Sequence, residues 1–443
     1  MDFRSIEYNK ISKFAHWSQR GYYPDNPHKQ NQDAYGVTLK FAGEDGDSLF
    51  CVYDGHGDEG HDCARFAKKK LPQILAKYVR QKRVQRYTDK LKADGKSTKN
   101  GWNPIMWPLL NTKDYEDCCT KAFRETNKLM HDDKTVKDKL SGTTAVTVGF
   151  HGGRMTVCNV GDSRVVIGHR IDSSSANKLG GLTLVHEEET KEEEKCEIEA
   201  DENNAIEVTS HADQSTTTST SRSGHYMAIP LTKDQTPYRK DERERLRKEG
   251  AEVKSIDQMQ GREPMHDNWG DLVMGDQVDV HGDPPRVWAK GKEYPGTAFT
   301  RSLGDSLAEG IGVHATPEIV TTHLTKNDKY LVIATDGIFE FLTNQRVIEM
   351  CDKSKSPLEA CENLVKAAYD QWLVYERRTD DITVIVCFLE NSYNPKPAEE
   401  DTTESLVATA HDCYGSKPLR SNVTNQEEST VFGIGNAAVT PAK

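Results

Sequence analysis

The feature that most constrains the fold is a series of short runs rich in β-branched residues, several of which lie next to an aspartate. Runs of this length and composition are typical of β-strands. Carboxylates at the ends of buried strands can bind hard divalent cations, and two such cations side by side can support a hydrolysis. Four aspartates have this placement: Asp33, Asp54 after Leu49–Tyr53, Asp336 after Tyr330–Thr335, and Asp380 before Ile382–Phe388.

Three further strand-like runs follow one another closely, at Thr143–Phe150, Arg154–Asn159 and Arg164–Gly168. The pairs Gly152-Gly153 and Gly161-Asp162 between them predict tight turns. Together these runs predict an antiparallel meander.

Three other stretches repeat apolar residues at helical spacing, from Ala64 to Tyr78, from Tyr115 to Leu129 and from Leu358 to Tyr375. We interpret these stripes as faces of helices that pack on a core. Pro72 lies inside the first stretch, and we expect it to kink or divide that helix.

Composition and charge indicate additions to a compact core. The chain has 443 residues and a mean hydropathy of −0.74, which is low for a compact globule. Residues 68–99 carry twelve basic and two acidic side chains, and residues 187–207 carry eleven acidic and two basic ones. We expect insertions at about 80–112 (basic, then turn-rich) and at 171–226, where an acidic run and a Ser/Thr tract predict disorder. Residues 392–443 show no strong period and are predicted to be a C-terminal extension.

The sequence favours an intracellular protein, in the cytoplasm, the nucleus or both. No apolar run approaches the ~18 residues of a membrane span. The N-terminus has neither a signal-like apolar stretch nor the glycine needed for acylation. The ten cysteines include no C-x-x-C pair, so neither a zinc site nor a disulfide framework is expected.

The four aspartates could act together as ligands of metal ions. Carboxylate and carbonyl oxygens suit Mg²⁺ or Mn²⁺ better than zinc, and Gly55 could add a backbone carbonyl because it lacks a Cβ. A water bridging two such ions loses a proton near neutral pH and becomes a nucleophile. His56, one residue further on, could protonate the leaving oxygen.

The alternative is that Asp-Gly pairs merely mark turns after strands. That alternative would suffice for any one aspartate alone. Four of them together, with His56 in the element Asp54-Gly55-His56-Gly57, favour a metal site.

Short motifs occur in a fixed order along the chain: Asn31-Gln32-Asp33, Val52–Gly57, Ser141–Ala145, Asn159–Arg164, Leu231–Asp234, Arg286–Trp288, Thr300–Asp305, Pro317–Ile319, Ala334–Phe339 and Asp380–Thr383. In this order, over roughly residues 15–390, they resemble the metal-dependent protein serine/threonine phosphatases of type 2C, the PPM family. The resemblance implies an α+β fold with a central antiparallel β-sandwich, flanked by helices on both faces in α/β/β/α layers. It also implies a PPM-type domain over residues 1–391.

The resemblance further implies a two-metal cleft at one end of the sandwich. Carried over by motif, Asp54 is similar to the carboxylate that bridges both metals, and Gly55 offers its carbonyl. His56 is similar to the general acid. Asp162 matches an aspartate linked to a weaker third metal in relatives, although it could equally hold a turn. The remaining ligands, direct or through water, are expected to be Asp33, Asp336 and Asp380.

Several positions depart from the family pattern. His28 stands about five residues before Asp33, where many relatives carry an arginine that binds substrate phosphate. Lys29 or Arg20 could substitute for it. Arg301, Gly304 and Asp305 belong to a family motif, and we expect them to form a turn with a buried ion pair. The other departures are Gln32 for glutamate, Glu340 for aspartate and Gln235 for histidine.

The expected function is Mg²⁺- or Mn²⁺-dependent hydrolysis of phosphoserine and phosphothreonine on proteins, by a metal-bridging hydroxide with His56 as general acid. Two ions per active site are expected, with room for a weaker third. We expect a monomer that acts on phosphoprotein substrates and does not bind nucleic acid. One alternative is a non-catalytic, phosphatase-like binding module. A second is a metal-dependent nuclease that uses the basic segment.

Overall fold

The structure is a computed structural model that describes residues 11–44, 46–95, 109–171, 226–266, 269, 275–276 and 282–389. The chain divides into two compact units, one of Met1–His169 with Tyr226–Lys443 and the other of Arg170–His225. The fold below is that of the first unit. Within the described residues, no helix has the length and apolar character needed to cross a membrane.

Two five-stranded sheets form the centre of this unit, and every strand pair with an assigned register is antiparallel. The first sheet has the order β1-β16-β15-β8-β9: β1 (Ile11–Gln19), β16 (Ile382–Leu389), β15 (Asp328–Ala334), β8 (Arg164–Arg170) and β9 (Tyr226–Pro230). The second has the order β14-β7-β6-β3-β2: β14 (Glu318–Thr322), β7 (Arg154–Val160), β6 (Ala145–His151), β3 (Ser48–Tyr53) and β2 (Ala34–Leu39).

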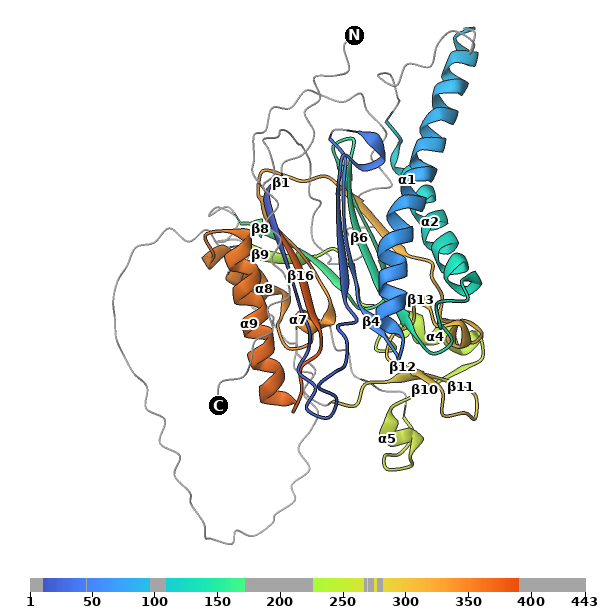
Figure 1. Cartoon of the computed structure of the whole chain (residues 1–443), viewed down its shortest axis with the longest axis vertical. Coiled ribbons are helices and arrows are strands. Elements are labelled where there is room, and N and C mark those ends of the chain that lie inside the picture. The colour runs from blue at the N-terminus through green and yellow to red at the C-terminus, as the bar shows by residue number, and fades with distance from the viewer. Residues whose placement is uncertain are drawn as a thin grey trace, which may run out of the picture. The chain divides into compact units, whose positions relative to one another are not determined.

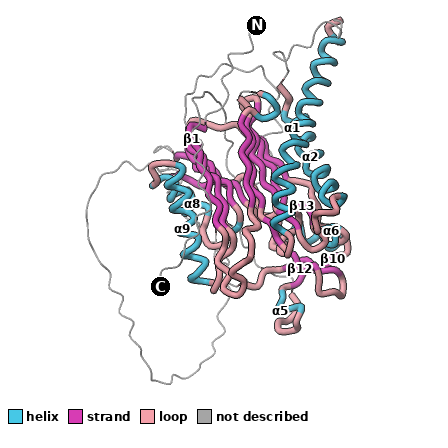
Figure 2. The backbone as a smooth tube through the Cα atoms, in the orientation of Figure 1, coloured by secondary structure: helices cyan, strands magenta, loops and turns pink. Residues whose placement is uncertain are grey.

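Helices cover the outer face of each sheet. Helices α8 (Asn344–Lys353) and α9 (Pro357–Tyr375) lie on one side, and α1 (Gly60–Ala93) and α2 (Thr112–Asp132) lie on the other (Figure 1). In the tube view, the two layers of strands stand between the two layers of helices (Figure 2). The expected α+β sandwich with α/β/β/α layers is therefore confirmed.

The core consists of three apolar layers that follow this stacking. Phe50, Val148 and Ile333 belong to the cluster between the two sheets. A second cluster joins α1 and α2 to the β2-β3-β6-β7 face, and a third joins α8 and α9 to the β15-β16 face. The sheets are thus held by packing on both faces, which accounts for the almost wholly apolar strands β6 and β16.

The predicted meander is right at its first turn and wrong at its second. Strands β6 and β7 form the expected hairpin, but β8 lies in the other sheet, between β15 and β9. The far edge of β7 is already occupied by β14. At the crossing, Gly161 has a φ of +101°, and its N–H donates to Gln235 Oε1 over 2.8 Å. Strand β8 instead lies between two neighbours, β15 and β9, which both belong to the first sheet.

Of the two effects expected of Pro72, a division of the helix does not occur, because α1 runs unbroken to Ala93. A kink at this residue stays a prediction. An internal proline costs a helix ~3 kcal/mol, but Leu71, Ile74 and Leu75 are buried against the second sheet. The free energy gained by this packing offsets the cost of the proline in the helix. The basic segment that begins at residue 80 therefore starts as helix, and Arg83 is buried in an ion pair with Asp47.

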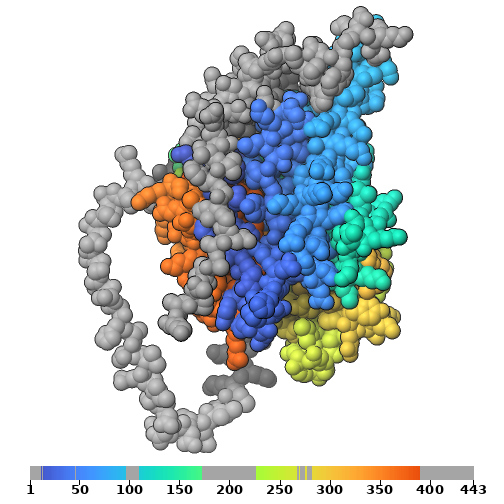
Figure 3. All heavy atoms as spheres, viewed as in Figure 1, coloured from blue at the N-terminus to red at the C-terminus, as the bar shows by residue number. Residues whose placement is uncertain are grey.

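Smaller elements complete the unit at the end of the sandwich where the strands meet the predicted site. β4 (Gly55–His56), β5 (Gly142–Thr143) and β13 (Leu303–Gly304) form one three-stranded sheet, and β10 (Ala251–Lys254), β11 (Arg286–Ala289) and β12 (Pro295–Thr297) form another. The space-filling view shows the yellow-green and yellow residues around the second small sheet as a lobe beside the ends of α1 and α2 (Figure 3). The short helices are η2 (Phe41–Gly43), α4 (Lys240–Lys248), α5 (Ile256–Met259), α6 (Ser306–Glu309) and α7 (Asp336–Phe339).

Candidate active site

The four predicted aspartates come together at one end of the sandwich. Asp33 precedes β2 and Asp54 follows β3, which are paired strands of the second sheet. Asp336 follows β15 and Asp380 precedes β16, which are paired strands of the first. Thr335 links the two sheets here, because its Oγ1 donates to Asp33 Oδ2 over 3.1 Å.

The four carboxyl groups lie close enough for the charge of one to change the pKa of another. Burial raises the pKa of Asp54 well above its usual range, and the charges of Asp336, Asp33 and Asp380 raise it further. The pKa of Asp33 is likewise raised well above its usual range, chiefly by burial. Burial and the charge of Asp380 raise the pKa of Asp336 to about 6, although a hydrogen bond with Asp54 partly opposes this. Packing several carboxylates together is unfavourable unless cations compensate for their charge.

Two of these side chains carry a buried oxygen without a hydrogen-bond partner in the described part of the chain, Asp33 Oδ1 and Asp336 Oδ1. Buried polar atoms are normally satisfied. Oxygen donors with unused lone pairs, in a crowded acidic site, fit a hard divalent cation such as Mg²⁺ or Mn²⁺. Asp380 differs, because its Oδ1 accepts a hydrogen bond of 2.5 Å from Tyr23 Oη.

The tightest clusters of potential ligands lie elsewhere. Among the described residues, three ligand atoms within 4.8 Å of one another occur at Glu59, His61 and Asp62, and at Asp241, Glu242 and Glu318. The four aspartates are more widely spread than this. Such spacing suits ligands shared between two ions about 3.5–4 Å apart, with waters completing the coordination.

Gly55 is restricted to glycine by its surroundings. A Cβ at this position would lie 2.4 Å from the carbonyl oxygen of Gly60 and 2.5 Å from that of Gln32. A side chain would therefore push apart the segments that carry Asp33 and Asp54. The predicted metal-binding role of the Gly55 carbonyl remains a prediction.

His56 is held by a buried aspartate. Its Nε2 lies 2.6 Å from Oδ2 of Asp305, which is only 2 % exposed. The same oxygen accepts a hydrogen bond of 2.6 Å from Ser302 Oγ, and the His56 ring lies 4.2 Å from that of Phe299 between centroids. The expected turn is present, since Gly304 has a φ of +94° and Asp305 one of +51°. The contact with His56 was not predicted, and the only sequence signal for it is the motif Thr300–Asp305.

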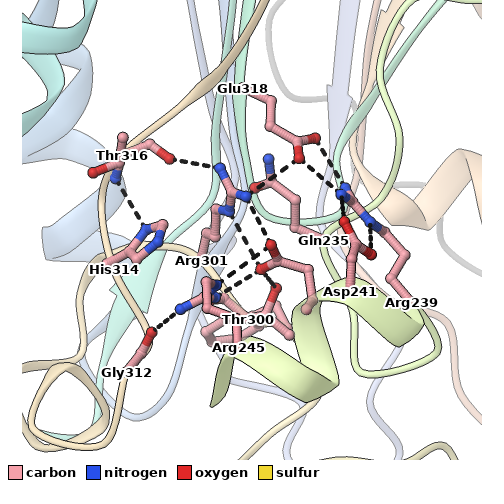
Figure 4. A network of polar contacts seen from close by, with 12 residues as sticks. Gln235, Arg239, Asp241, Arg245, Thr300, Arg301, Gly312, His314, Thr316 and Glu318 are labelled. Atoms are coloured by element: carbon pink, nitrogen blue, oxygen red, sulfur yellow. Dashed lines mark hydrogen bonds and ion pairs between the residues drawn. The ribbon is translucent and has the colours of Figure 1, made fainter. Parts of the chain in front are cut away.

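The expected buried ion pair of this motif is also present. Arg301 lies between Glu318 and Glu242, with its Nη2 3.2 Å and 2.7 Å from their carboxylates (Figure 4). Arg245 also contacts Glu242 at 2.7 Å, and Arg239 contacts Glu318 at 2.8 Å. The carboxylates of this cluster are thus paired with guanidinium groups. The network anchors the segment that leads to Asp305, and it is not a cation site.

Asp162, between β7 and β8, faces the same acidic site. Burial raises its pKa well above the usual range, and the charges of Asp336 and Asp234 add to this effect. The sequence left its role open between a turn and a weaker metal site. Its electrostatic coupling to Asp336 favours the second.

A cavity of about 270 Å³ opens beside these aspartates. Asp162, Asp336 and Asp380 line it, as do three arginines, Arg164, Arg286 and Arg378. The candidates for a replacement phosphate ligand are placed differently. Arg20 Nη1 donates to the carbonyl oxygens of Pro27 and Lys29, and Lys29 Nζ lies 3.9 Å from the centre of the Tyr23 ring. Neither they nor His28 belong to the described lining of this cavity.

Comparison with known proteins identifies the family of this chain. Residues 25–195 and 218–373 match the family model "Protein phosphatase 2C". The chain is 34 % identical over 378 residues to "Probable protein phosphatase 2C 35" of Arabidopsis thaliana, a match that covers 85 % of this chain and 84 % of the relative. It is 28 % identical to "Probable protein phosphatase 2C 73" of Oryza sativa subsp. japonica, over 84 % and 72 % of the two chains.

Two solved structures share the fold. The serine-threonine phosphatase 2C from Toxoplasma gondii matches with a TM-score of 0.56 at 14 % identity, over 87 % of this chain and 98 % of its own. A C. elegans sex determining protein matches with a TM-score of 0.51 at 15 % identity, over 85 % and 64 % of the chains. These two structures match the fold of this chain. The chain belongs to the protein phosphatase 2C family, which makes it a protein serine/threonine phosphatase.

Proposed function

We propose that this protein is a Mg²⁺- or Mn²⁺-dependent phosphatase that hydrolyses phosphoserine and phosphothreonine on intracellular proteins as a monomer. The observation that carries the proposal is the meeting of four aspartates from both sheets at one end of the sandwich. Two of them have buried oxygens without partners in the described chain, and all four lie close enough for their charges to act on one another.

Asp33, Asp54, Asp336 and Asp380 would hold two divalent cations, together with the carbonyl of Gly55. Asp162 would help to hold a weaker third. When bound, such ions supply a nucleophile by lowering the pKa of water, and they neutralise charge on the phosphoryl oxygens. The carboxylates balance the charge of the ions and fix the place at which the phosphoryl group reacts.

His56 would act as the general acid. As an imidazolium it donates Nε2–H to Asp305 and keeps Nδ1–H for the leaving oxygen of the serine or threonine. After that transfer the neutral ring still donates Nε2–H to Asp305, so the aspartate holds one orientation throughout. Asp305 is therefore a positioning residue, supported in turn by Ser302 and by the arginine network below it.

The direct test is hydrolysis of p-nitrophenyl phosphate and of a phosphoserine peptide with and without Mn²⁺ or Mg²⁺. We expect activity to require the metal, to disappear in EDTA and to be lost in Asp54→Ala. Asp89→Asn is a matched control, since this carboxylate lies on the exposed part of α1 near Gln85. Full activity in EDTA after exhaustive dialysis would refute the metal-dependent mechanism. A metal-binding protein without turnover would favour the non-catalytic binding module instead.

A further inference from the structure

The cavity beside the aspartates has two chemically different parts. One part is acidic and includes Asp336 and Asp380. The other contains Arg286, from β11, and Arg378, from the segment between α9 and β16. A third lining arginine, Arg164, is already paired with Asp234 through two hydrogen bonds of 3.0 and 2.5 Å. Arg286 and Arg378 are therefore the cations of this cavity with capacity to bind something else.

Arg286 is only weakly satisfied for a largely buried guanidinium. Its Nη1 donates to the carbonyl oxygen of Gly296 over 3.1 Å, and its buried Nε has no partner within the described chain. Asp283, whose charge acts on Arg286, accepts hydrogen bonds of 3.0 Å from the backbone N–H groups of Ile256 and Asp257. A buried charged donor without an acceptor is costly, and such a group is often completed by a ligand.

Arg378 adds a second positive charge to the same space. Its Nε lies 3.5 Å from a carboxylate oxygen of Glu376, and both side chains are exposed, so this pair contributes little. Burial lowers the pKa of Arg286; the charge of Asp283 opposes this shift, and the like charge of Arg378 adds to it. Two guanidinium groups that repel each other across one cavity become favourable when an anion lies between them.

We propose that Arg286 and Arg378 form a subsite for a second anionic group of the substrate, close in sequence to the phosphorylated residue. The group is a carboxylate of Asp or Glu, or a second phosphate. The cavity, at about 270 Å³, lies just below the ~300 Å³ of small-ligand pockets, which suits one reacting side chain and one neighbour. This inference rests on the proposed function, because it places the reacting phosphate at the acidic part.

An apolar wall supports the same assignment. Phe341 stacks on Tyr375 with ring centroids 4.9 Å apart, and it meets Trp372 edge-on at 4.8 Å. All three line the cavity. They offer contact to the carbon atoms of a peptide, while the two arginines select for its charge.

The test compares three phosphoserine peptides that differ at one flanking position, which carries Ala, Glu or a second phosphoserine. Each is assayed with p-nitrophenyl phosphate as reference, in the wild-type protein and in Arg286→Gln and Arg378→Gln. Arg377→Gln is the matched control, because this exposed arginine is adjacent in sequence but does not line the cavity. The varied residue is placed in turn at each of the two positions before and the two positions after the reacting phosphoserine.

We expect the wild type to prefer an anionic peptide over the Ala peptide by about tenfold in kcat/KM. Arg286→Gln and Arg378→Gln should each remove most of that preference through KM, and should lower kcat/KM for the Ala peptide and for p-nitrophenyl phosphate by a smaller factor than for the anionic peptides. Arg377→Gln should keep it. The anion that the subsite binds is the one, Glu or the second phosphate, whose peptide loses more kcat/KM in the two variants.

Equal kcat/KM for all three peptides in the wild type would overturn the inference, as would an equal loss in Arg377→Gln. If Arg286→Gln does not fold, Arg378→Gln in its exposed segment still decides the question. Absence of metal-dependent hydrolysis of p-nitrophenyl phosphate by the wild type would instead refute the proposed function itself, so the two failures are distinguishable.

Discussion

At the scale of single residues, the pair of His56 and Asp305 gives the sharpest test of mechanism. A serine alkoxide needs a proton as it leaves, whereas p-nitrophenolate barely does. We therefore expect His56→Gln to reduce turnover of a phosphopeptide by a factor approaching ~10²–10⁴, and turnover of p-nitrophenyl phosphate clearly less. Asp305→Asn should show the same substrate dependence with a smaller loss.

Ser302→Ala is the control for this pair, because it removes the other hydrogen bond to the same Asp305 oxygen. We expect Ser302→Ala to keep the wild-type ratio of turnover on the phosphopeptide to turnover on p-nitrophenyl phosphate. Equal losses on both substrates in His56→Gln, or rescue by extra Mn²⁺, would remove His56 from the role of general acid.

Asp336 allows the acidic site to be tested without an activity assay. Its pKa is raised to about 6 in the folded protein, chiefly by burial and by Asp380, whereas an unfolded aspartate titrates near ~3.9. Ionisation is therefore unfavourable in the metal-free fold, and stability should fall as the pH rises from about 4 to about 6. At pH 7.5 in EDTA, we expect Asp336→Asn to melt at a higher temperature than the wild type. With Mn²⁺ present, we expect the variant to have lost turnover.

Asp25 is exposed, so Asp25→Asn is a control that removes one negative charge outside the acidic site. Asp25→Asn should leave both the metal-free melting temperature and its response to Mn²⁺ unaltered. A metal-free Asp336→Asn that melts below the wild type would contradict the crowding of carboxylates described above.

At the scale of elements, α1 is joined to the second sheet by a buried ion pair far along the helix. Arg83 Nη2 lies 2.7 Å from Asp47 Oδ2, and both side chains are almost fully buried. Removing one partner of such a pair leaves an uncompensated buried charge and costs ~3–5 kcal/mol. We expect Arg83→Met to lower the free energy of unfolding by that order, measured by urea denaturation.

The double variant Arg83→Met with Asp47→Asn should regain part of this loss, because it removes the stranded carboxylate. Arg80→Met serves as the control on the same helix, where the guanidinium reaches only the carbonyl oxygen of Ala42. If Arg83→Met is as stable as Arg80→Met, α1 does not depend on the ion pair beyond residue 80.

At the scale of the whole molecule, the segment between β8 and β9 should be dispensable for folding. These two strands are neighbours in one sheet, so a short connection can replace the residues between them. Long insertions add little closure entropy, ~0.6 kcal/mol per doubling of length. We expect deletion of residues 175–222 to leave turnover of p-nitrophenyl phosphate largely intact.

Thermal melting and turnover of the deleted protein provide the measurement. The segment 171–226, which the sequence predicts to be disordered, falls almost wholly outside the described residues. The 392–443 extension and most of the turn-rich part of 80–112 also fall outside them. A deleted protein that does not fold would show that the segment belongs to the core.

The local pattern of the sequence was enough to predict six strands of the sandwich and the helices α1, α2 and α9, and it singled out the four aspartates. Strand-like runs and helical stripes reflect burial that repeats every two or 3.6 residues, which is visible without knowledge of the partners. The aspartates were recognisable because each stands where a strand begins or ends. The layered α+β fold was predicted from the resemblance to the phosphatase family that the ordered motifs carry.

Only the tertiary structure decided which strands are neighbours and which distant side chains meet. Nothing local distinguishes the turn at Gly161 from a hairpin, since β8 is drawn to the other sheet by the places open beside β15 and β9. The continuation of α1 through Pro72 depends in the same way on packing against the second sheet. The contact of Asp305 with His56, and the shared cavity of Arg286 and Arg378, join segments far apart in the chain. Such contacts depend on the summed packing of the whole fold, which no short window of sequence contains.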